Sequence, residues 1–280
     1  MTATETNKIT IIGCGYVGFA VANFWHDRSH QLTVTTTTPT KVSKLEKIAN
    51  KVVITKGNNF DRLLEIIEGR DTILLSVGPR RGNPYRETYL ETAQNIVKVI
   101  QATNNKPKQL IYTSSYSVLG DKKGAWVDEN TPLQPNSENG KILAETEKLL
   151  LSISNETLKV CILRLGGIYG PGRELIKIFK NWAGTTRPGK GEDYSNWIHL
   201  DDIVNAIELA RSQRLQGLYH LAGDRPLQTK ELFDRLFATH QLPTITWDAS
   251  SPATRSYNSR LDIQKIKAAG LKLIHPEIEF

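Results

Sequence analysis

Ile9-Thr-Ile-Ile-Gly-Cys-Gly-Tyr-Val-Gly18 combines three features of one supersecondary unit. Its isoleucines predict a short buried strand, and a helical pattern follows the glycines as far as Trp25. Between strand and helix, the glycines have the Gly-x-Gly-x-x-Gly spacing that is typical of a dinucleotide-binding turn. The alternative is a glycine turn that binds nothing.

Each glycine has a separate role in such a turn. Gly13 permits the tight turn, Gly15 leaves room for a diphosphate near the backbone, and Gly18 lets the helix lie close to the strand. The helix N-terminus then offers unpaired N–H groups to the phosphates. We therefore predict that the cofactor contacts these three glycines together with Tyr16 and Val17.

Strand and helix patterns alternate along the following hundred residues. This alternation predicts an α/β fold, a doubly wound parallel (Rossmann) sheet with helices on both faces. Ligands of such sheets bind at the carboxyl ends of the strands. Within the loops at those ends, the expected cofactor contacts are Asn58, Val77 and Gly78.

The loop after the second predicted strand bears on the choice of cofactor. NAD-binding chains place an acidic residue near this point, but from Thr35 onward no carboxylate occurs before Glu46. Thr36, Thr37 and Lys41 suit the 2′-phosphate of NADP instead. The sequence therefore favours NADP over NAD, although a solvent-facing threonine-rich strand end would explain the same residues.

Composition limits the function classes. The net charge is +7 over 280 residues, without a run of Lys and Arg interleaved with aromatic residues, so a small-molecule substrate is expected and nucleic acid is not. No segment has the length and apolarity of a membrane span, and no secretory signal is visible, so a cytoplasmic location is expected. Cys14 and Cys161 are expected to be reduced, packed thiols.

The middle and later parts of the chain resemble a known family. The segments Ile111–Gly120, Leu163–Arg173, Asn196–Val204 and Gly217–Ala222 are similar to motifs of the extended short-chain dehydrogenase/reductases, the NAD-dependent epimerase/dehydratase group. The resemblance runs from about Lys8 to Gly270.

The resemblance implies an oxidoreductase with two parts and the family's usual homodimer. A dinucleotide-binding domain would span residues 1–165, completed by about 202–222. A small substrate-binding part would comprise 166–201 and 223–280.

The chemistry of the family uses a Ser, a Tyr and a Lys. Ser115 matches the serine that orients the substrate oxygen, and Lys141 matches the lysine that binds the nicotinamide ribose. Ser137 stands at the tyrosine position, and an aliphatic hydroxyl is a far weaker acid than a phenol. Ile12 also replaces the first family glycine, so the chain resembles the atypical branch without the usual tyrosine.

Another hydroxyl could replace the missing tyrosine. Tyr169, just beyond a predicted strand, is the first candidate, and Tyr85 and Tyr194 are further ones. Tyr116 is expected to face away, because neighbouring strand residues point to opposite faces. Each of these aromatic residues could instead serve packing alone.

Arginines in the loops after the predicted strands could bind an anionic group of the substrate. Arg81, Arg173 and Arg187 are the candidates, and solvated loop charge is the equal alternative. No metal site is expected, because His199 has no second ligand at the i+4 position.

Two functions remain open. The first is an NADP-dependent enzyme of the epimerase/dehydratase type that acts on a small, anionic, sugar-nucleotide-like carbonyl or alcohol. The second is a non-catalytic NADP(H)-binding sensor or regulator.

Overall fold

The computed structural model describes residues 6–79, 84–253 and 257–280. The chain divides into two compact units. The first contains residues 1–114, 141–163 and 206–218, and the second contains 115–140, 164–205 and 219–280. Residues 115–140 thus group with the second unit, whereas the sequence-based boundaries, which stay a prediction, keep them in the first.

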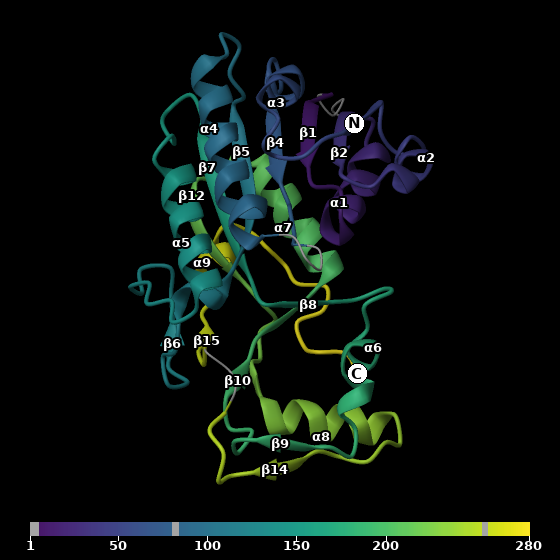
Figure 1. The fold of residues 1–280 in the computed structure, drawn as a ribbon, viewed down its shortest axis with the longest axis vertical. Helices are drawn as coiled ribbons and strands as arrows, with labels where there is room; N and C mark the ends of the chain where they lie inside the picture. Colours follow the sequence, from purple (N-terminus) through teal and green to yellow (C-terminus); the bar gives the residue numbers. More distant parts are fainter. Residues whose placement is uncertain (1–5, 80–83, 254–256) are drawn as a thin grey trace. The chain divides into compact units, whose positions relative to one another are not determined.

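A seven-stranded sheet in the order β12-β7-β5-β4-β1-β2-β3 forms the centre of the fold (Figure 1). The pairs β1–β2, β1–β4, β2–β3 and β4–β5 are parallel. The predicted doubly wound Rossmann fold is therefore confirmed. The strands are β1 (Lys8–Ile12), β2 (Gln31–Thr36), β3 (Lys51–Ile54), β4 (Thr72–Leu75), β5 (Gln109–Ser115), β7 (Lys159–Leu165) and β12 (Gly217–Leu221).

Helices cover both faces of this sheet because its strands are apolar on both sides. On one face, Ile66 and Ile96 pack with Ile73 of β4 in a fully buried cluster. On the other, Trp25 Nε1 donates a hydrogen bond of 2.8 Å to Glu208 Oε2. The helices are α1 (Tyr16–His26), α2 (Val42–Leu45), α3 (Phe60–Ile67), α4 (Thr92–Ala102), α5 (Glu138–Leu151) and α7 (Leu200–Ser212).

The second unit has its own apolar core around Phe233, Phe237 and Tyr169. Short strand pairs and further helices complete the unit. The helices are α6 (Leu175–Phe179), α8 (Thr229–Thr239) and α9 (Gln264–Ala268). The strands are β6 (Trp126–Val127), β8 (Gly167–Tyr169), β9 (Thr186–Pro188), β10 (Tyr194–Ser195), β11 (Trp197–His199), β13 (Leu227–Gln228), β14 (Thr246–Asp248) and β15 (Arg260–Leu261).

Two helices differ from the sequence pattern. The periodicity of residues 40–50 predicts one helix, yet α2 ends at Leu45. Beyond Leu45 the chain turns, with Ile48 N donating to Leu45 O at 3.0 Å, and Asn50 Oδ1 accepts a hydrogen bond of 2.8 Å from Leu32 N just before β3. The long helix predicted from Tyr85 contains a π-helical turn, Glu87–Glu91, before α4.

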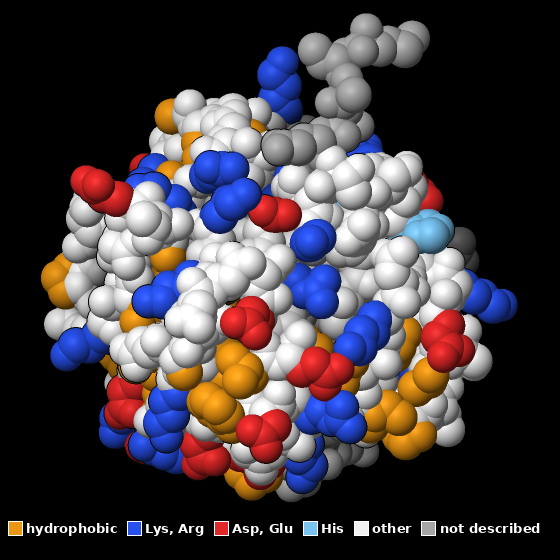
Figure 2. All heavy atoms as spheres, turned by 90° about the horizontal axis from the view of Figure 1, so that it is seen from above, with side chains coloured by type: hydrophobic (Ala, Val, Ile, Leu, Met, Phe, Trp, Pro, Cys, Tyr) orange, Lys and Arg blue, Asp and Glu red, His pale blue; other side chains and the backbone are white. Residues whose placement is uncertain are grey.

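Surface charge is mixed on the face drawn in Figure 2. Lys and Arg side chains lie there among Asp and Glu side chains. Ion pairs of the first unit include Lys108 with Asp71 at 2.8 Å and Arg62 with Glu65 at 2.9 Å. Within residues 6–79, 84–253 and 257–280, none of the helices has both the length and the apolarity that a membrane crossing requires.

The glycine turn between β1 and α1 is tightly built. Gly13 has a φ of 94°, and a Cβ added there would lie 2.6 Å from the carbonyl oxygen of Ser76. Its N–H donates to Thr35 Oγ1 at 2.9 Å. Gly18 is equally restricted, because a Cβ would collide with the Gly13 carbonyl oxygen. Gly15, by contrast, has no atom within 4 Å of an added Cβ.

We expect Gly13→Ala to lower the free energy of unfolding by about 2 kcal/mol, because the new methyl group meets rigid backbone at a positive φ. Gly15→Ala is the matched control, and it should leave the free energy of unfolding almost unchanged. Chemical denaturation of both variants measures the difference. Equal losses of stability would show that this description of the turn is wrong.

Candidate functional site

A cavity of about 150 Å³ lies at the carboxyl ends of β1, β2, β3 and β4, entirely within the first unit. This is the edge where parallel sheets bind ligands. Its walls include seven of the predicted cofactor contacts: Gly13, Gly15, Thr36, Thr37, Lys41, Val77 and Gly78. Tyr16, Val17 and Gly18 lie next to this wall in the first turn of α1, and Asn58 follows the lining residue Gly57.

The N-terminus of α1 is suited to an anion. Gly15 occupies the N-cap position, where no side chain makes a capping hydrogen bond, and the first turn contains no acidic residue. The open space beside Gly15 leaves the backbone accessible. These features favour a phosphate at the start of the helix, where backbone N–H groups and the helix dipole both attract negative charge.

The threonines at the end of β2 and just after it close one side of the cavity. Thr35 is buried, and its carbonyl and hydroxyl oxygens accept hydrogen bonds from Cys14 N and Gly13 N, both at 2.9 Å. Thr36 Oγ1 accepts a bond of 3.1 Å from Thr38 N. Two of the threonine hydroxyls thus shape the loop, while Lys41 is exposed beside them.

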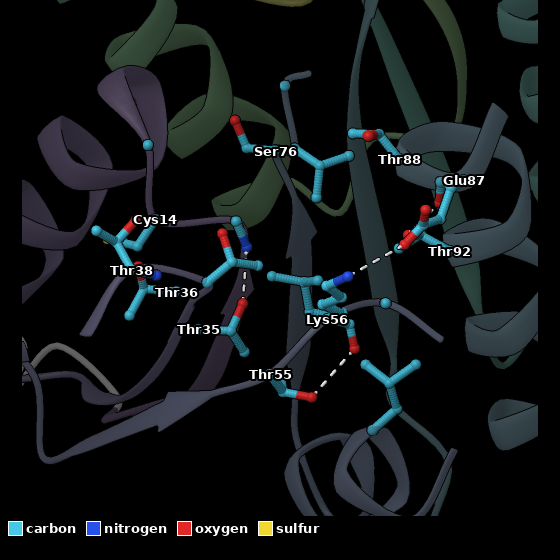
Figure 3. Close-up of a pocket in the computed structure, with 18 of the residues that line it drawn as sticks. Cys14, Thr35, Thr36, Thr38, Thr55, Lys56, Ser76, Glu87, Thr88 and Thr92 are labelled. Atoms are coloured by element: carbon cyan, nitrogen blue, oxygen red, sulfur yellow. Dashed lines mark hydrogen bonds and ion pairs between the residues drawn. The ribbon is translucent and has the colours of Figure 1, made fainter. Parts of the chain in front are cut away.

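The opposite wall includes residues that sequence reasoning missed. Lys56 Nζ lies 3.7 Å from Glu87 Oε1, and Thr88 and Thr92 line the same wall (Figure 3). Glu87 and Thr88 lie in the π-helical turn, and Thr92 is the first residue of α4. Turns of this type are frequent at functional sites. Gly57 permits the approach, because a Cβ there would overlap Thr92. In the sequence, the one feature that could have pointed to this wall is the break between β3 and α3, where Lys56 and Gly57 lie.

Cys14 is a buried, free thiol in the glycine turn, and Cys161 is buried and free as well. Burial raises the pKa of Cys14 to about 12, and the positive charge of Lys41 opposes this only in part. The thiol therefore stays protonated and unreactive at neutral pH.

Ser115 and Ser137 both cap backbone turns in the second unit. Ser115 ends β5, and its Oγ accepts a hydrogen bond of 3.3 Å from Ser117 N. Ser137 Oγ accepts one of 3.1 Å from Gly140 N in the first turn of α5. Lys141 belongs to the first unit and is exposed on α5. Their predicted roles toward substrate and cofactor stay predictions.

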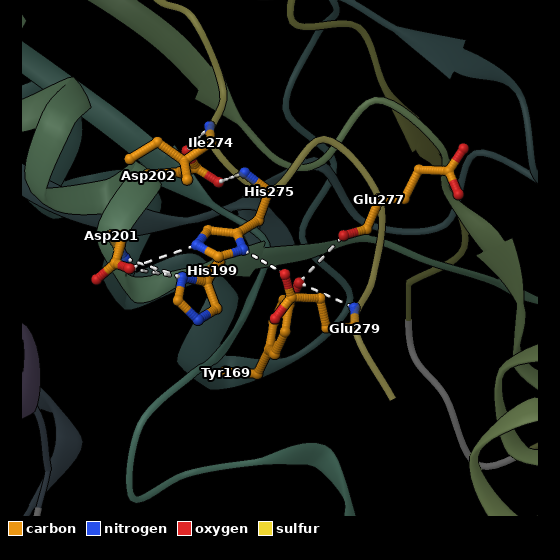
Figure 4. A network of polar contacts seen from close by, with 8 residues as sticks. All are labelled: Tyr169, His199, Asp201, Asp202, Ile274, His275, Glu277 and Glu279. Carbon is orange, nitrogen blue, oxygen red and sulfur yellow. Dashed lines mark hydrogen bonds and ion pairs between the residues drawn. The ribbon is translucent and has the colours of Figure 1, made fainter. Parts of the chain in front are cut away.

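Tyr169 holds the C-terminal segment of the chain (Figure 4). Its hydroxyl donates to Glu277 O and accepts from Glu279 N, both at 3.3 Å. Burial raises the pKa of Tyr169 to about 12. This arrangement favours a structural role for the hydroxyl, and the predicted catalytic role stays untested.

Two histidines lie beside this tyrosine with their ring centroids 3.7 Å apart. Burial lowers the pKa of His199, and the nearby charge of His275 adds to the effect. Burial alone would lower the pKa of His275 too, but its hydrogen bond to Glu279 and the charge of that carboxylate outweigh burial and raise it. His275 therefore takes up a proton more readily than His199.

His199, Asp201 and His275 offer ligand atoms that lie within 4.8 Å of one another, so they could hold a metal ion. Sequence spacing did not reveal this group, because His275 lies far along the chain from the other two. His199 Nδ1 already accepts the N–H of Asp201 at 3.2 Å, and both His275 nitrogens face carboxylates. The expectation of no metal site stays a prediction.

The three arginines predicted to bind the substrate do not form one site among the described residues. Arg81 lies outside the described residues. Arg173 is exposed, and its Nε donates to Ile168 O at 3.0 Å. Arg187 lines a second cavity, of about 340 Å³, within the second unit.

Tyr116 also lines this second cavity. Its expected orientation away from the catalytic centre stays a prediction, although strand alternation does not apply to it. The reason is local: β5 ends at Ser115, and Tyr116 begins a 3₁₀ turn that extends to Leu119. Its ring packs edge-on against Tyr257 at a centroid distance of 5.0 Å.

Comparison with known proteins agrees with this architecture. The model of the NAD dependent epimerase/dehydratase family matches residues 9–220. The protein YeeZ of Escherichia coli K12 is 32% identical over 210 residues, which is 72% of each chain. The chloroplastic epimerase family protein SDR39U1 homolog of Arabidopsis thaliana is 25% identical over 157 residues, 52% of this chain and 44% of that one.

Solved structures share the fold. Human epimerase family protein SDR39U1, crystallised with NADPH, has a TM-score of 0.76 and 16% identity over 96% of each chain. The dTDP-glucose 4,6-dehydratase DesIV of Streptomyces venezuelae, crystallised with NAD, has a TM-score of 0.79 and 18% identity, over 98% of this chain and 93% of that one. The cavity at the strand ends, the matched family model and these relatives together place the chain in the NAD-dependent epimerase/dehydratase family of short-chain dehydrogenase/reductases.

Proposed function

We propose that this chain is an NADP(H)-dependent oxidoreductase of its family. The observation that supports this most is the composition of the first cavity. An open glycine turn and an uncapped helix start lie on one side of it, and threonines with Lys41 follow β2. Among the described residues that line it, the one carboxylate is Glu87, which faces Lys56.

The charge at the end of β2 supports NADP rather than NAD. A carboxylate there would repel the 2′-phosphate of NADP, whereas the ammonium of Lys41 attracts it. Lys41 is exposed at the rim, so it can meet a phosphate without breaking an interior contact. Among proteins of similar fold, human SDR39U1 was crystallised with NADPH, and DesIV with NAD.

The proposed reaction is the oxidation or reduction of a small carbonyl or alcohol. The nicotinamide supplies or accepts the hydride when it is bound. Ser115 orients the substrate oxygen, and Lys141 binds the nicotinamide ribose. The proton comes from water or from a tyrosine of another loop, because Ser137 is too weak an acid. Among the tyrosines, the Tyr169 hydroxyl is bonded to backbone, which makes it a weaker candidate than the sequence suggests.

A second candidate function follows from Ser137. Its hydroxyl caps α5 through Gly140 N, so the position of the family tyrosine has a structural use here. This favours a protein that binds NADP(H) without turnover and reports the coenzyme ratio to a partner. The homodimer, with a surface formed by α4 and α5, and the cytoplasmic location stay predictions for either function.

Lys41→Ala should weaken NADPH binding about tenfold and leave NADH binding unchanged, because a charge-assisted hydrogen bond to the 2′-phosphate is lost. Isothermal titration with both coenzymes measures this. Lys44→Ala is the matched control, because Lys44 lies over the Phe19 ring and does not line the cavity. If Lys41→Ala weakened the binding of NADPH and NADH equally, the lysine would not contact the 2′-phosphate.

Ser137→Tyr separates the two functions. If the rest of the site is intact, the new phenol should raise NADPH-dependent carbonyl reduction by about a hundredfold, the lower range for a general acid. The rate of NADPH oxidation, measured at 340 nm with a panel of carbonyl compounds, tests this expectation. Ser137→Phe, which supplies the ring without the hydroxyl, is the control and should give no gain. NADPH binding without turnover in the unchanged protein and in both variants would favour the sensor over the enzyme.

A further inference from the structure

The second unit contains a cavity of about 340 Å³, a volume within the range of small-molecule sites. Its walls come from α6, β9, β11, α8 and β14 and from the loops beside them. Nothing in the first cavity depends on it, since the linings of the two cavities share no residue.

Seven of the sixteen residues that line this cavity are aromatic. Phe179 packs edge-on against Trp182, Trp197 and Phe233 at centroid distances of 5.1, 5.6 and 5.0 Å. Trp247 lies 6.5 Å from Phe233 on the same wall. Flat apolar walls of this kind favour a planar, largely apolar ligand, which can stack on the rings.

Two hydrogen-bond donors on this wall are buried and have no acceptor among the residues that the structure describes: Arg187 Nε and Trp247 Nε1. The other buried indole N–H groups have partners, because Trp197 Nε1 donates to Ser195 Oγ at 2.6 Å and Trp25 Nε1 to Glu208 Oε2 at 2.8 Å. A buried donor without a partner is unfavourable, because it has lost its hydrogen bonds to water without replacing them. Both donors would therefore gain from a ligand that brings oxygen atoms into the cavity.

The two donors are neighbours on one small sheet. β9 and β14 are parallel, and their register pairs Arg187 directly with Trp247. The guanidinium lies 3.6 Å from the centroid of the Trp182 ring, which holds it flat. Gly191 fits closely against Trp247, since an added Cβ would lie 2.6 Å from Cε2. The donors are thus held in place before any ligand binds.

We propose that Arg187 and Trp247 bind the carboxylate of a planar, mainly apolar substrate, whose body stacks on the aromatic wall. A carboxylate has two oxygens, so it can accept from both donors and also neutralise the guanidinium. Asp193 lines the same cavity, and its backbone carbonyl accepts from Thr229 N and Oγ1, each at 2.8 Å. That the ligand is the substrate rests on the proposed function, whereas the binding site itself does not.

Isothermal titration with trans-cinnamate, its neutral isostere cinnamamide and UDP-glucose tests the proposal on the full chain. Cinnamate should bind at least tenfold more tightly than cinnamamide, and UDP-glucose should not compete with it. Arg187→Gln and Trp247→Phe should each weaken cinnamate about tenfold, the loss expected for one charge-assisted hydrogen bond. Trp247→Phe keeps the ring and removes only the N–H.

Arg28→Gln is the matched control, because Arg28 also lies over an aromatic ring, Phe24, at 3.4 Å but lines neither cavity. Circular dichroism verifies that each variant is folded. Equal affinity for acid and amide, no binding of cinnamate, or displacement of cinnamate by UDP-glucose would overturn the proposal. NADPH titration of the same samples keeps the two proposals apart, since failure of coenzyme binding would leave the cinnamate result intact.

Discussion

The close approach of backbone to backbone at Gly13 is the constraint on which the first unit, with its cavity at the strand ends, depends. The turn presses against the Ser76 carbonyl at the end of β4, and Gly13 and Cys14 both donate hydrogen bonds to Thr35 at the end of β2. One turn thereby joins the ends of three strands. It also positions the start of α1 and leaves the space beside Gly15 open.

Local patterns in the sequence predicted this half of the fold well. Alternation of strand and helix predicted the parallel sheet, because each element there is apolar at its own period. The prediction was wrong over residues 40–50, where the helix ends at Leu45 and Asn50 bonds instead to Leu32, a contact between distant residues that a local pattern does not encode. At Tyr116 the strand has already ended, so alternation does not apply there, and the expectation that its side chain faces away from the catalytic centre stays a prediction.

The rest of the structure depends on contacts between segments that are far apart in the chain. Tyr116, Trp182, Trp197 and Trp247 meet at one cavity only after folding, and the sole sequence signal was the gathering of tryptophans in the later part of the chain. His275 reaches His199 in the same way. The two cavities differ in chemistry: threonines and lysines form one, and indole rings with two unpaired donors form the other. A polar coenzyme and an apolar acid would each find a matching site.

A crystal structure of the full chain grown with NADPH tests the central claim most directly. We predict diphosphate density against the N–H groups of residues 15–17, with the 2′-phosphate between Thr37 and Lys41. Density for the adenine ribose away from the end of β2, or a cavity that stays empty at saturating NADPH, would contradict the assignment of this cavity to the coenzyme.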